Sequence, residues 1–220
     1  MYLSQLILDP RARRVQSEIA NPYELHRTLL KAFPDQEQGG PGRVLYRLEP
    51  PVRGRGPELI LLVQSDQEPD WSKLDQPPGY RLPNGQGNPK VFNPAFSPGQ
   101  RLYFRLRANP TKRLLHDDPE RKLKKGQRIG LLKEEDQLHW LQRKAQEGGF
   151  SVLGVTIAAE GKQQGKIRHP DEQPHDLTYL AVRFEGLLQV TDPGRFLNTL
   201  RQGLGSGKGL GFGLLSLART

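Results

Sequence analysis

The chain has 220 residues, of which 35% are hydrophobic, and it carries a formal net charge of +9 without a single cysteine. This length allows one large domain or two small ones. The lack of cysteine excludes disulfides and thiolate metal sites and fits a cytoplasmic protein. No stretch approaches the roughly 20 apolar residues of a membrane span, so no membrane partner is expected. The excess of positive charge favours a polyanionic partner.

The first half of the sequence predicts the element order β-α-β-β-(α)-β. Residues 3–8 form an apolar, strand-type run. A helix start follows, with Asn21 as the N-cap, Pro22 at the first helical position and Glu24 placed to bond back to the cap. We expect this helix to reach Phe33. Further along, the patterns predict strands over residues 43–49 and 58–63, a short helical piece over 70–74 and a strand over 90–96.

The second half repeats this order. Strands are predicted over residues 101–109, 150–158, 177–188 and 213–218, with helices over 134–147 and from Asp192-Pro193 to Gly203. Two βαββαβ halves predict an α+β protein with tandem ferredoxin-like domains, a topology shared with RRM-like RNA-recognition sheets. We place the boundary at Ser97-Pro98-Gly99, which gives domains of residues 1–97 and 98–220.

Glycine occupies every second position from Gly203 to Gly213, with Ser206 and Lys208 among the residues between. Bare backbone N–H groups next to a lysine suit phosphate. The spacing matches neither Walker A nor G-x-G-x-x-G, so no nucleotide cofactor is expected. The run is therefore either a loop for another phosphate or a flexible connector. By itself it does not locate the chemistry.

Positive charge is concentrated in residues 101–128, which carry ten Lys/Arg against three acidic residues. Such a run is commonly a solvated linker. Residues 101–107 also follow a strand pattern, so that several cations project from an ordered element and favour a nucleic-acid surface. A second basic stretch contains Lys162, Lys166 and Arg168, and is equally typical of a groove-binding hairpin or a soluble loop.

The first predicted helix carries the best catalytic candidates. Its apolar face consists of Leu25, Leu29, Ala32 and Phe33, whereas Tyr23, Arg27 and Lys31 form a stripe on another face. His26 lies between the two. Histidine moves protons near neutral pH, and cations stabilise a pentacoordinate phosphorane. From these residues alone, an ordinary boundary histidine is the more common interpretation. No histidine has a convincing metal-ligand spacing, so no metal site is expected.

Several blocks along the chain resemble the CasE-type CRISPR repeat-RNA endoribonucleases of type I-E Cascade systems. They are Met1-Tyr-Leu-Ser, Tyr23-Glu-Leu-His26, the run from Tyr103 to Lys112, Trp140-Leu-Gln-Arg-Lys, Phe184-Glu-Gly and residues 203–217. The blocks span nearly the whole chain in the order of the family. Residues 65–98 and 160–176 align poorly.

The resemblance implies tandem ferredoxin-like domains that cut the stem-loop of precursor CRISPR RNA without metal or another cofactor. It implies attack by the 2′-hydroxyl next to the scissile phosphate, which leaves a cyclic phosphate and a 5′-hydroxyl. His26 matches the catalytic histidine of the family, Tyr23 the tyrosine that accompanies it, and Lys31 a supporting lysine. The glycine run matches a loop near RNA and the domain interface. Retention of the cleaved product makes other Cascade subunits the expected protein partners.

The residues expected to bind the repeat RNA hairpin are basic side chains and the glycine loop: Arg27, Arg105, Arg107, Lys112, Arg113, Lys162, Lys166, Arg168, Gly205, Ser206, Gly207 and Lys208. Two alternatives remain at this point. One is a non-catalytic RNA-binding subunit with the same fold and basic surface. The other is a general tandem RNA-recognition protein for single strands, which the missing RNP1 pattern disfavours.

Overall fold

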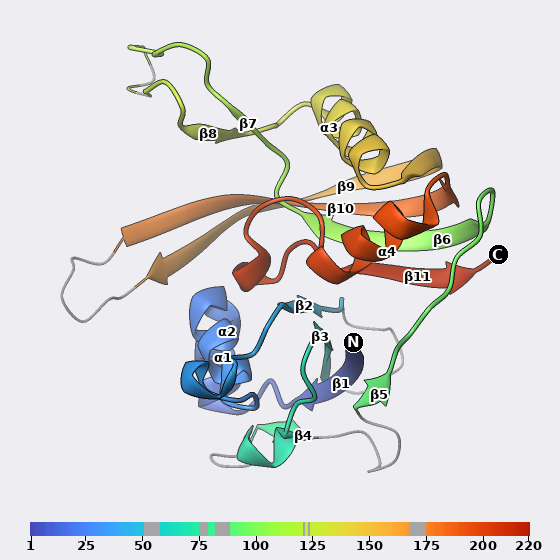
Figure 1. The fold of residues 1–220 in the computed structure, drawn as a ribbon. Helices are drawn as coiled ribbons and strands as arrows, with labels where there is room; N and C mark the ends of the chain where they lie inside the picture. The colour runs from blue at the N-terminus through green and yellow to red at the C-terminus, as the bar shows by residue number, and fades with distance from the viewer. Residues whose placement is uncertain (51–57, 75–78, 82–88, 121, 123, 168–174) are drawn as a thin grey trace.

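Two antiparallel sheets with their helices make up the structure, a computed structural model (Figure 1). It describes residues 1–50, 58–74, 79–81, 89–120, 122, 124–167 and 175–220. The N-terminal sheet lies below the C-terminal one in the view of Figure 1. In the described part of the chain, no helix is both long enough and apolar enough to cross a membrane.

The N-terminal sheet has the strand order β2-β3-β1-β4, and β5 also pairs with β1. Its strands are β1 (Tyr2–Leu8), β2 (Val44–Leu48), β3 (Leu59–Ser65), β4 (Tyr80–Arg81) and β5 (Lys90–Val91). Its helices are α1 (Arg13–Ala20), α2 (Pro22–Leu30) and the 3₁₀ turns η1 (Gln36–Gln38) and η2 (Trp71–Leu74). The predicted apolar face of the first helix is confirmed, because Leu25, Leu29, Ala32 and Phe33 are all buried in one core.

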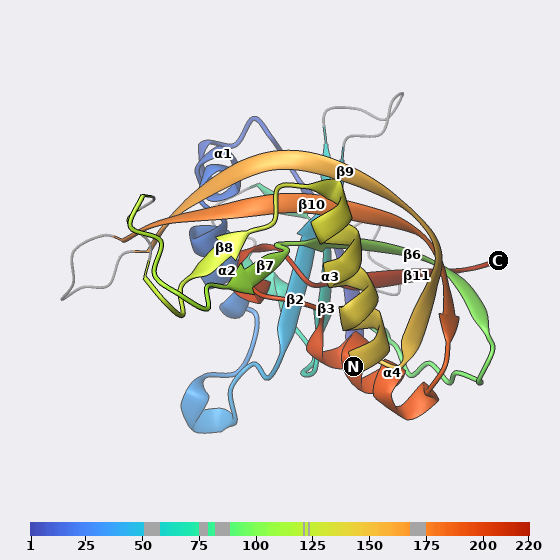
Figure 2. The same ribbon diagram turned by 90° about the horizontal axis from the view of Figure 1, so that it is seen from above.

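The C-terminal sheet has the strand order β11-β6-β10-β9. Its strands are β6 (Arg101–Ala108), β9 (Phe150–Ile167), β10 (His175–Val190) and β11 (Leu215–Arg219). Helices α3 (Glu134–Glu147) and α4 (Pro193–Gln202) cover one face of this sheet (Figure 2). Trp140 of α3 stacks on Phe184 of β10, and Phe196 of α4 packs edge-on against Phe150 of β9, so the helices and the sheet share one core.

In each sheet the first strand lies between the third strand and the last, which is the ferredoxin-like arrangement. The predicted α+β class with tandem ferredoxin-like units is therefore confirmed. The last helix of the first unit is reduced to η2, a single 3₁₀ turn held by buried Trp71 and Leu74. The division at residues 97 and 98 stays a prediction.

Arg47 of β2 joins the two sheets. Its guanidinium is 3% exposed and donates to the carbonyls of Arg105 and Leu214, at 3.1 Å each, and to the Ser216 hydroxyl at 2.8 Å. Glu49 balances the charge at 2.6 Å. A second bond links the two units where the Gln64 side chain of β3 donates to the Leu200 carbonyl of α4. Buried polar contacts of this kind fix the position of one unit against the other.

The structure corrects several predicted boundaries. Helix α1 was not predicted, because it is short and polar on average: Val15 and Ile19 pack on the core, and Glu18 is buried among Arg14, Thr28 and Tyr80. Helix α2 ends at Leu30, short of Phe33, and tighter i→i+3 bonds continue the turn to that residue. Asn21 makes no side-chain cap bond, and its N–H closes α1 by bonding to the Ser17 carbonyl.

Three strand predictions also change. The predicted strand over 90–96 is only the two-residue β5. An unpredicted two-stranded hairpin, β7 (Thr111–Arg113) and β8 (Arg128–Gly130), lies within the basic segment. Strand β9 runs well past its predicted end at 158, whereas β10 begins only two residues before its predicted start at 177; the two continue to pair beyond the sheet as a long two-stranded arm (Figure 1).

Candidate active site and nucleic-acid interface

His26 lies on α2 next to the buried face of that helix. Pro22 begins the helix and Leu25 fixes its rotation by packing in the core, which leaves the imidazole of His26 half-buried at the edge. The ring stacks on Tyr46 of β2, with ring centroids 6.1 Å apart and planes at 19°. The histidine is thus held in one orientation by an aromatic neighbour.

The glycine loop covers His26. A Cβ added at Gly209 would lie 3.1 Å from Cδ2 and 3.2 Å from Nε2 of the imidazole, so only glycine lets the backbone come this close without displacing the ring. Gly207 and Gly211 flank the short turn η3 (Lys208–Leu210) with left-handed φ angles of 76° and 80°. The sequence of this run does not by itself locate the chemistry, and tertiary folding places the run against the candidate histidine.

Tyr46 also joins the loop to the start of α2. Its hydroxyl lies 2.7 Å from the Pro22 carbonyl and 3.3 Å from the Gly209 carbonyl, and donates to these backbone oxygens. Burial raises the pKa of Tyr46 far above its ordinary value, which keeps the hydroxyl protonated as a donor. One side chain therefore stacks on the imidazole and ties down the two segments that enclose it.

Burial lowers the pKa of His26 below its ordinary value. Among the described residues no hydrogen-bond partner reaches its buried Nδ1. The imidazole is consequently neutral at pH 7 and available to accept a proton. A neutral imidazole packed against backbone is better suited to transferring a proton than to forming a permanent ion pair.

The predicted stripe of Tyr23, Arg27 and Lys31 does not stay together: Tyr23 contacts the glycine loop, whereas the two cations are exposed to solvent. Tyr23 is half-buried and packs against a small cluster that contains Leu210 and Phe212, so it lies with His26 beneath the glycine loop. Arg27 and Lys31 are exposed and line a separate hollow on α2, where Arg27 pairs with Glu24 at 3.2 Å. The structure thus brings Tyr23 to His26 and leaves the two cations open to solvent nearby.

Arg105 and Arg107 are occupied by intramolecular ion pairs. Arg105 lies 2.5 Å from both Glu49 and Glu185, and Arg107 lies 2.6 Å from Glu160. The Arg107 guanidinium also sits over the Phe212 ring at 4.8 Å. Arg105 thus joins β6 to β10 and to Glu49 of the N-terminal unit, and Arg107 joins β6 to β9 and to the glycine loop; their role as phosphate ligands stays a prediction.

The β9–β10 arm carries the second group of predicted RNA-binding cations. Lys162 is exposed on the arm. The side chain of Lys166 and all of Arg168 lie outside the described residues. A long arm that leaves the sheet with an exposed cation has the shape of an element that enters a nucleic-acid groove (Figure 1).

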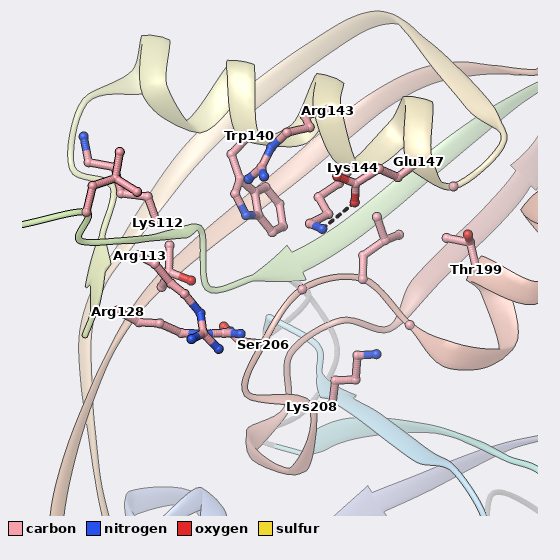
Figure 3. A pocket seen from close by; sticks show the side chains of 16 residues that line it. Lys112, Arg113, Arg128, Trp140, Arg143, Lys144, Glu147, Thr199, Ser206 and Lys208 are labelled. Atoms are coloured by element: carbon pink, nitrogen blue, oxygen red, sulfur yellow. Dashed lines mark hydrogen bonds and ion pairs between the residues drawn. The ribbon is translucent and has the colours of Figure 1, made fainter. Parts of the chain in front are cut away.

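A basic hollow of about 790 Å³ opens between the β7–β8 hairpin, α3 and the glycine loop (Figure 3). The predicted residues that line it are Lys112, Arg113, Gly205, Ser206 and Lys208. Gly207 is not part of the lining, since it packs on Phe212. Three further cations that were not predicted, Arg128, Arg143 and Lys144, also line the hollow. The sequence offered a signal for each of them: Arg128 lies in the basic segment, and Arg143 and Lys144 lie on the polar side of the helix predicted over residues 134–147.

No group of three or more His, Asp or Glu side chains in the described part of the chain is placed to hold a metal ion. His116 and His139 lie apart from His26 in the loop after β7 and in α3. Among the described residues, His26 is therefore the histidine that the fold encloses with candidate phosphate-binding elements.

The fold and this site define a tandem ferredoxin-like protein with a histidine and a glycine loop at the junction of its units. A family model described as "CRISPR associated protein" matches residues 1–219, and the chain belongs to this family. It is 44% identical to the CRISPR-associated endoribonuclease Cse3 of Thermus thermophilus, with 99% of this chain and all of that protein covered. It is 31% identical to the Cascade subunit CasE of Escherichia coli, with 99% of each covered.

The structure is also similar to a solved structure of Thermus thermophilus Cse3 bound to an RNA that represents a pre-cleavage complex. The TM-score is 0.78 at 42% identity, and the match covers 99% of this chain and 98% of that one. The similarity extends over both ferredoxin-like units, so it includes the elements that carry His26 and the glycine loop.

Proposed function

We propose that this chain is an endoribonuclease that binds the stem-loop of CRISPR repeat RNA and cleaves precursor CRISPR RNA. The observation that carries the proposal is His26, neutral and held between Tyr46 and Gly209 in a fold that presents basic surfaces on both sides. The relatives support it, since one is named an endoribonuclease and is seen with RNA before cleavage.

The reaction is a transfer within the RNA. The 2′-oxygen forms a bond to phosphorus while the bond from phosphorus to the 5′-oxygen breaks, which gives a cyclic phosphate and a 5′-hydroxyl. One proton leaves the 2′-hydroxyl for the imidazole, one reaches the 5′-oxygen from water, and the imidazolium then returns its proton to the solvent. These steps balance without a metal or a redox cofactor. The neutral imidazole of His26 accepts the first proton, and general base catalysis of this kind contributes about 10²–10⁴-fold.

The side chains near His26 take supporting roles in this proposal. Tyr23, packed with the histidine beneath the loop, orients the scissile phosphate through its hydroxyl. Lys31, the exposed C-cap of α2, stabilises the charge that develops on the phosphorane, and exposed Arg27 binds the RNA. Lys162 on the β9–β10 arm, together with Lys166 and Arg168, binds the stem of the hairpin.

The same proposal places the protein in the cytoplasm with other Cascade subunits as partners. One relative is named a Cascade subunit, which supports an assembly of this kind. Precursor RNA is made in the cytoplasm of bacteria, and the chain has no cysteine that would require an oxidising compartment.

The test is cleavage of repeat stem-loop RNA by the purified protein in EDTA, with His26→Ala beside the wild type. We expect cleavage by the wild type and at least about a 100-fold slower rate for the variant. An RNA with a 2′-deoxy sugar before the scissile phosphate should bind and stay intact. Cleavage that needs added metal, or that persists in the variant, contradicts the mechanism. Binding without cleavage by the wild type would instead favour a non-catalytic RNA-binding subunit.

A further inference from the structure

Two arginines face each other on the unpredicted β7–β8 hairpin. Arg113 and Arg128 are direct cross-strand partners, and both are exposed. Like charges directly opposite one another destabilise a strand pair. The described residues include no carboxylate paired with either guanidinium. The hairpin therefore holds two uncompensated positive charges side by side.

Four more cations line the same hollow from other positions. Lys112 comes from the hairpin, Arg143 and Lys144 from α3, and Lys208 from the glycine loop, as Figure 3 shows. The one carboxylate in the lining is Glu147, which is paired with Lys144 at 2.5 Å. Within the described residues, the hollow is thus a concave surface with a large excess of positive charge.

Lys208, which also lines the hollow, has a lowered pKa. Burial is the first cause that lowers its pKa, and repulsion from Arg43 and Lys144 lowers the pKa further. A polyanion in the hollow would remove that repulsion. Backbone at Gly205 borders the same space, since it lies against the Trp140 ring at the floor of the hollow with no room for a Cβ.

The size of the hollow favours a single-stranded nucleic acid over a duplex as its ligand. At about 790 Å³ it falls within the range of roughly 300–1,000 Å³ that is typical of sites for small molecules. A rigid duplex touches such a hollow only at its rim. A single strand bends into it, and its phosphates follow the cationic wall as in other single-strand sites.

The hollow and the candidate active site share one loop. Gly205, Ser206 and Lys208 line the hollow, and the next residue, Gly209, covers His26. We propose that the basic hollow binds the single-stranded RNA that adjoins the stem-loop, and so fixes the strand that crosses the glycine loop at the cleavage position. This rests on the proposed function, and it assigns to the hollow a part of the substrate separate from the stem.

The experiment compares RNAs with and without single-stranded flanks. The RNAs are a bare repeat stem-loop and the same stem-loop with its natural 5′ or 3′ flank, each with a 2′-deoxy sugar at the scissile position. The variant is Arg113→Gln/Arg128→Gln, and the matched control is Lys124→Gln/Lys125→Gln, which neutralises two exposed charges in the same hairpin segment outside the hollow. Circular dichroism checks that each variant is folded, and Arg143→Gln on α3 provides a second test of the hollow.

We expect the Arg113/Arg128 variant to bind a flanked RNA on the order of tenfold more weakly than the wild type. The slope of log affinity against log salt should fall by about 1.4, because each arginine that no longer neutralises a single-strand phosphate lowers it by about 0.7. The bare stem-loop should bind the variant and the wild type equally, and the control should bind both RNAs like the wild type.

Equal weakening for bare and flanked RNA would overturn the proposal, because the hollow would then contact the stem. Unchanged binding of both RNAs would overturn it too, and would make an acidic protein surface the better ligand for the hollow. Failure of the proposed function is distinguishable, since it would appear as a wild-type protein that neither binds nor cuts the stem-loop.

Discussion

Gly209 lies against His26 so closely that a Cβ would come within 3.1 Å of the imidazole Cδ2. The φ angle of Gly209 is not in the left-handed region, so an alanine there is limited by the imidazole and not by its own backbone. The contact joins residues almost a whole chain apart. It makes the glycine loop one wall of the candidate active site.

Gly209→Ala should therefore slow cleavage more than it weakens RNA binding. The added methyl group must push the imidazole or the loop by a few tenths of an ångström, and misplacement of a catalytic group is costly. We expect single-turnover cleavage to fall about tenfold. Gly154→Ala is the control, because Gly154 has an ordinary φ and open space around it. Equal rates for the two variants would show that the close contact has no catalytic role.

Tyr46→Phe tests the hydroxyl that ties α2 to the glycine loop. The ring still stacks on His26, whereas the bonds to the Pro22 and Gly209 carbonyls are removed. We expect the free energy of unfolding to fall by about 1 kcal/mol and the cleavage rate to fall as well. Urea denaturation and single-turnover kinetics measure the two effects. Exposed Tyr103 provides the matched Tyr→Phe control, which should change neither quantity.

The lowered pKa of His26 has a definite pH signature. Burial favours the neutral imidazole, so in the folded protein the pKa lies below the value of about 6.5 in the unfolded chain. As the pH falls through this window, the unfolded state binds a proton that the folded state excludes, and stability is lost. Above about pH 6.5 the contribution is fully present. His26→Gln should lack this part of the acid destabilisation in denaturation curves.

Cleavage should follow the same titration. A histidine that accepts a proton works while it is neutral, so the acid limb of the rate profile should lie below about pH 6.5. NMR titration of the imidazole in the free protein gives the pKa independently. An acid limb well above that pKa would assign the limb to another group and remove His26 from the role of base.

Arg47 holds the two units together and should be needed for stability. Arg47→Met leaves the carbonyls of Arg105 and Leu214 without this donor and removes the buried partner of Glu49. We expect a decrease of about 3 kcal/mol in the free energy of unfolding. Arg47→Lys should not restore it, because one ammonium cannot reproduce the planar fork of donors. Wild-type stability in Arg47→Lys would refute the role of this geometry.

Local patterns in the sequence predicted most of the fold. The third helix was predicted with its observed limits, Glu134 to Glu147, because its periodicity is long and Gly148 ends it. Helix α1 escaped prediction because only Val15 and Ile19 mark its core side, and periodicity cannot detect the buried polar cluster around Glu18. For the β9–β10 arm the sequence left a hairpin and a loop equally open, because its polar residues show no apolar alternation, and only the cross-strand pairing decides for the hairpin.

The order of the two βαββαβ halves, the basic character of the chain and the candidacy of His26 all follow from the amino-acid pattern. Three features emerge only when the chain is folded. The glycine loop lies on His26, and Arg105 and Arg107 form ion pairs with glutamates. The β7–β8 hairpin, α3 and the glycine loop together line one basic hollow. The physical reason is the distance along the sequence over which each interaction acts. Periodicity and capping act over a few neighbouring residues. The contact between Gly209 and His26 exists only after two sheets, formed by parts of the chain far apart in sequence, have packed together.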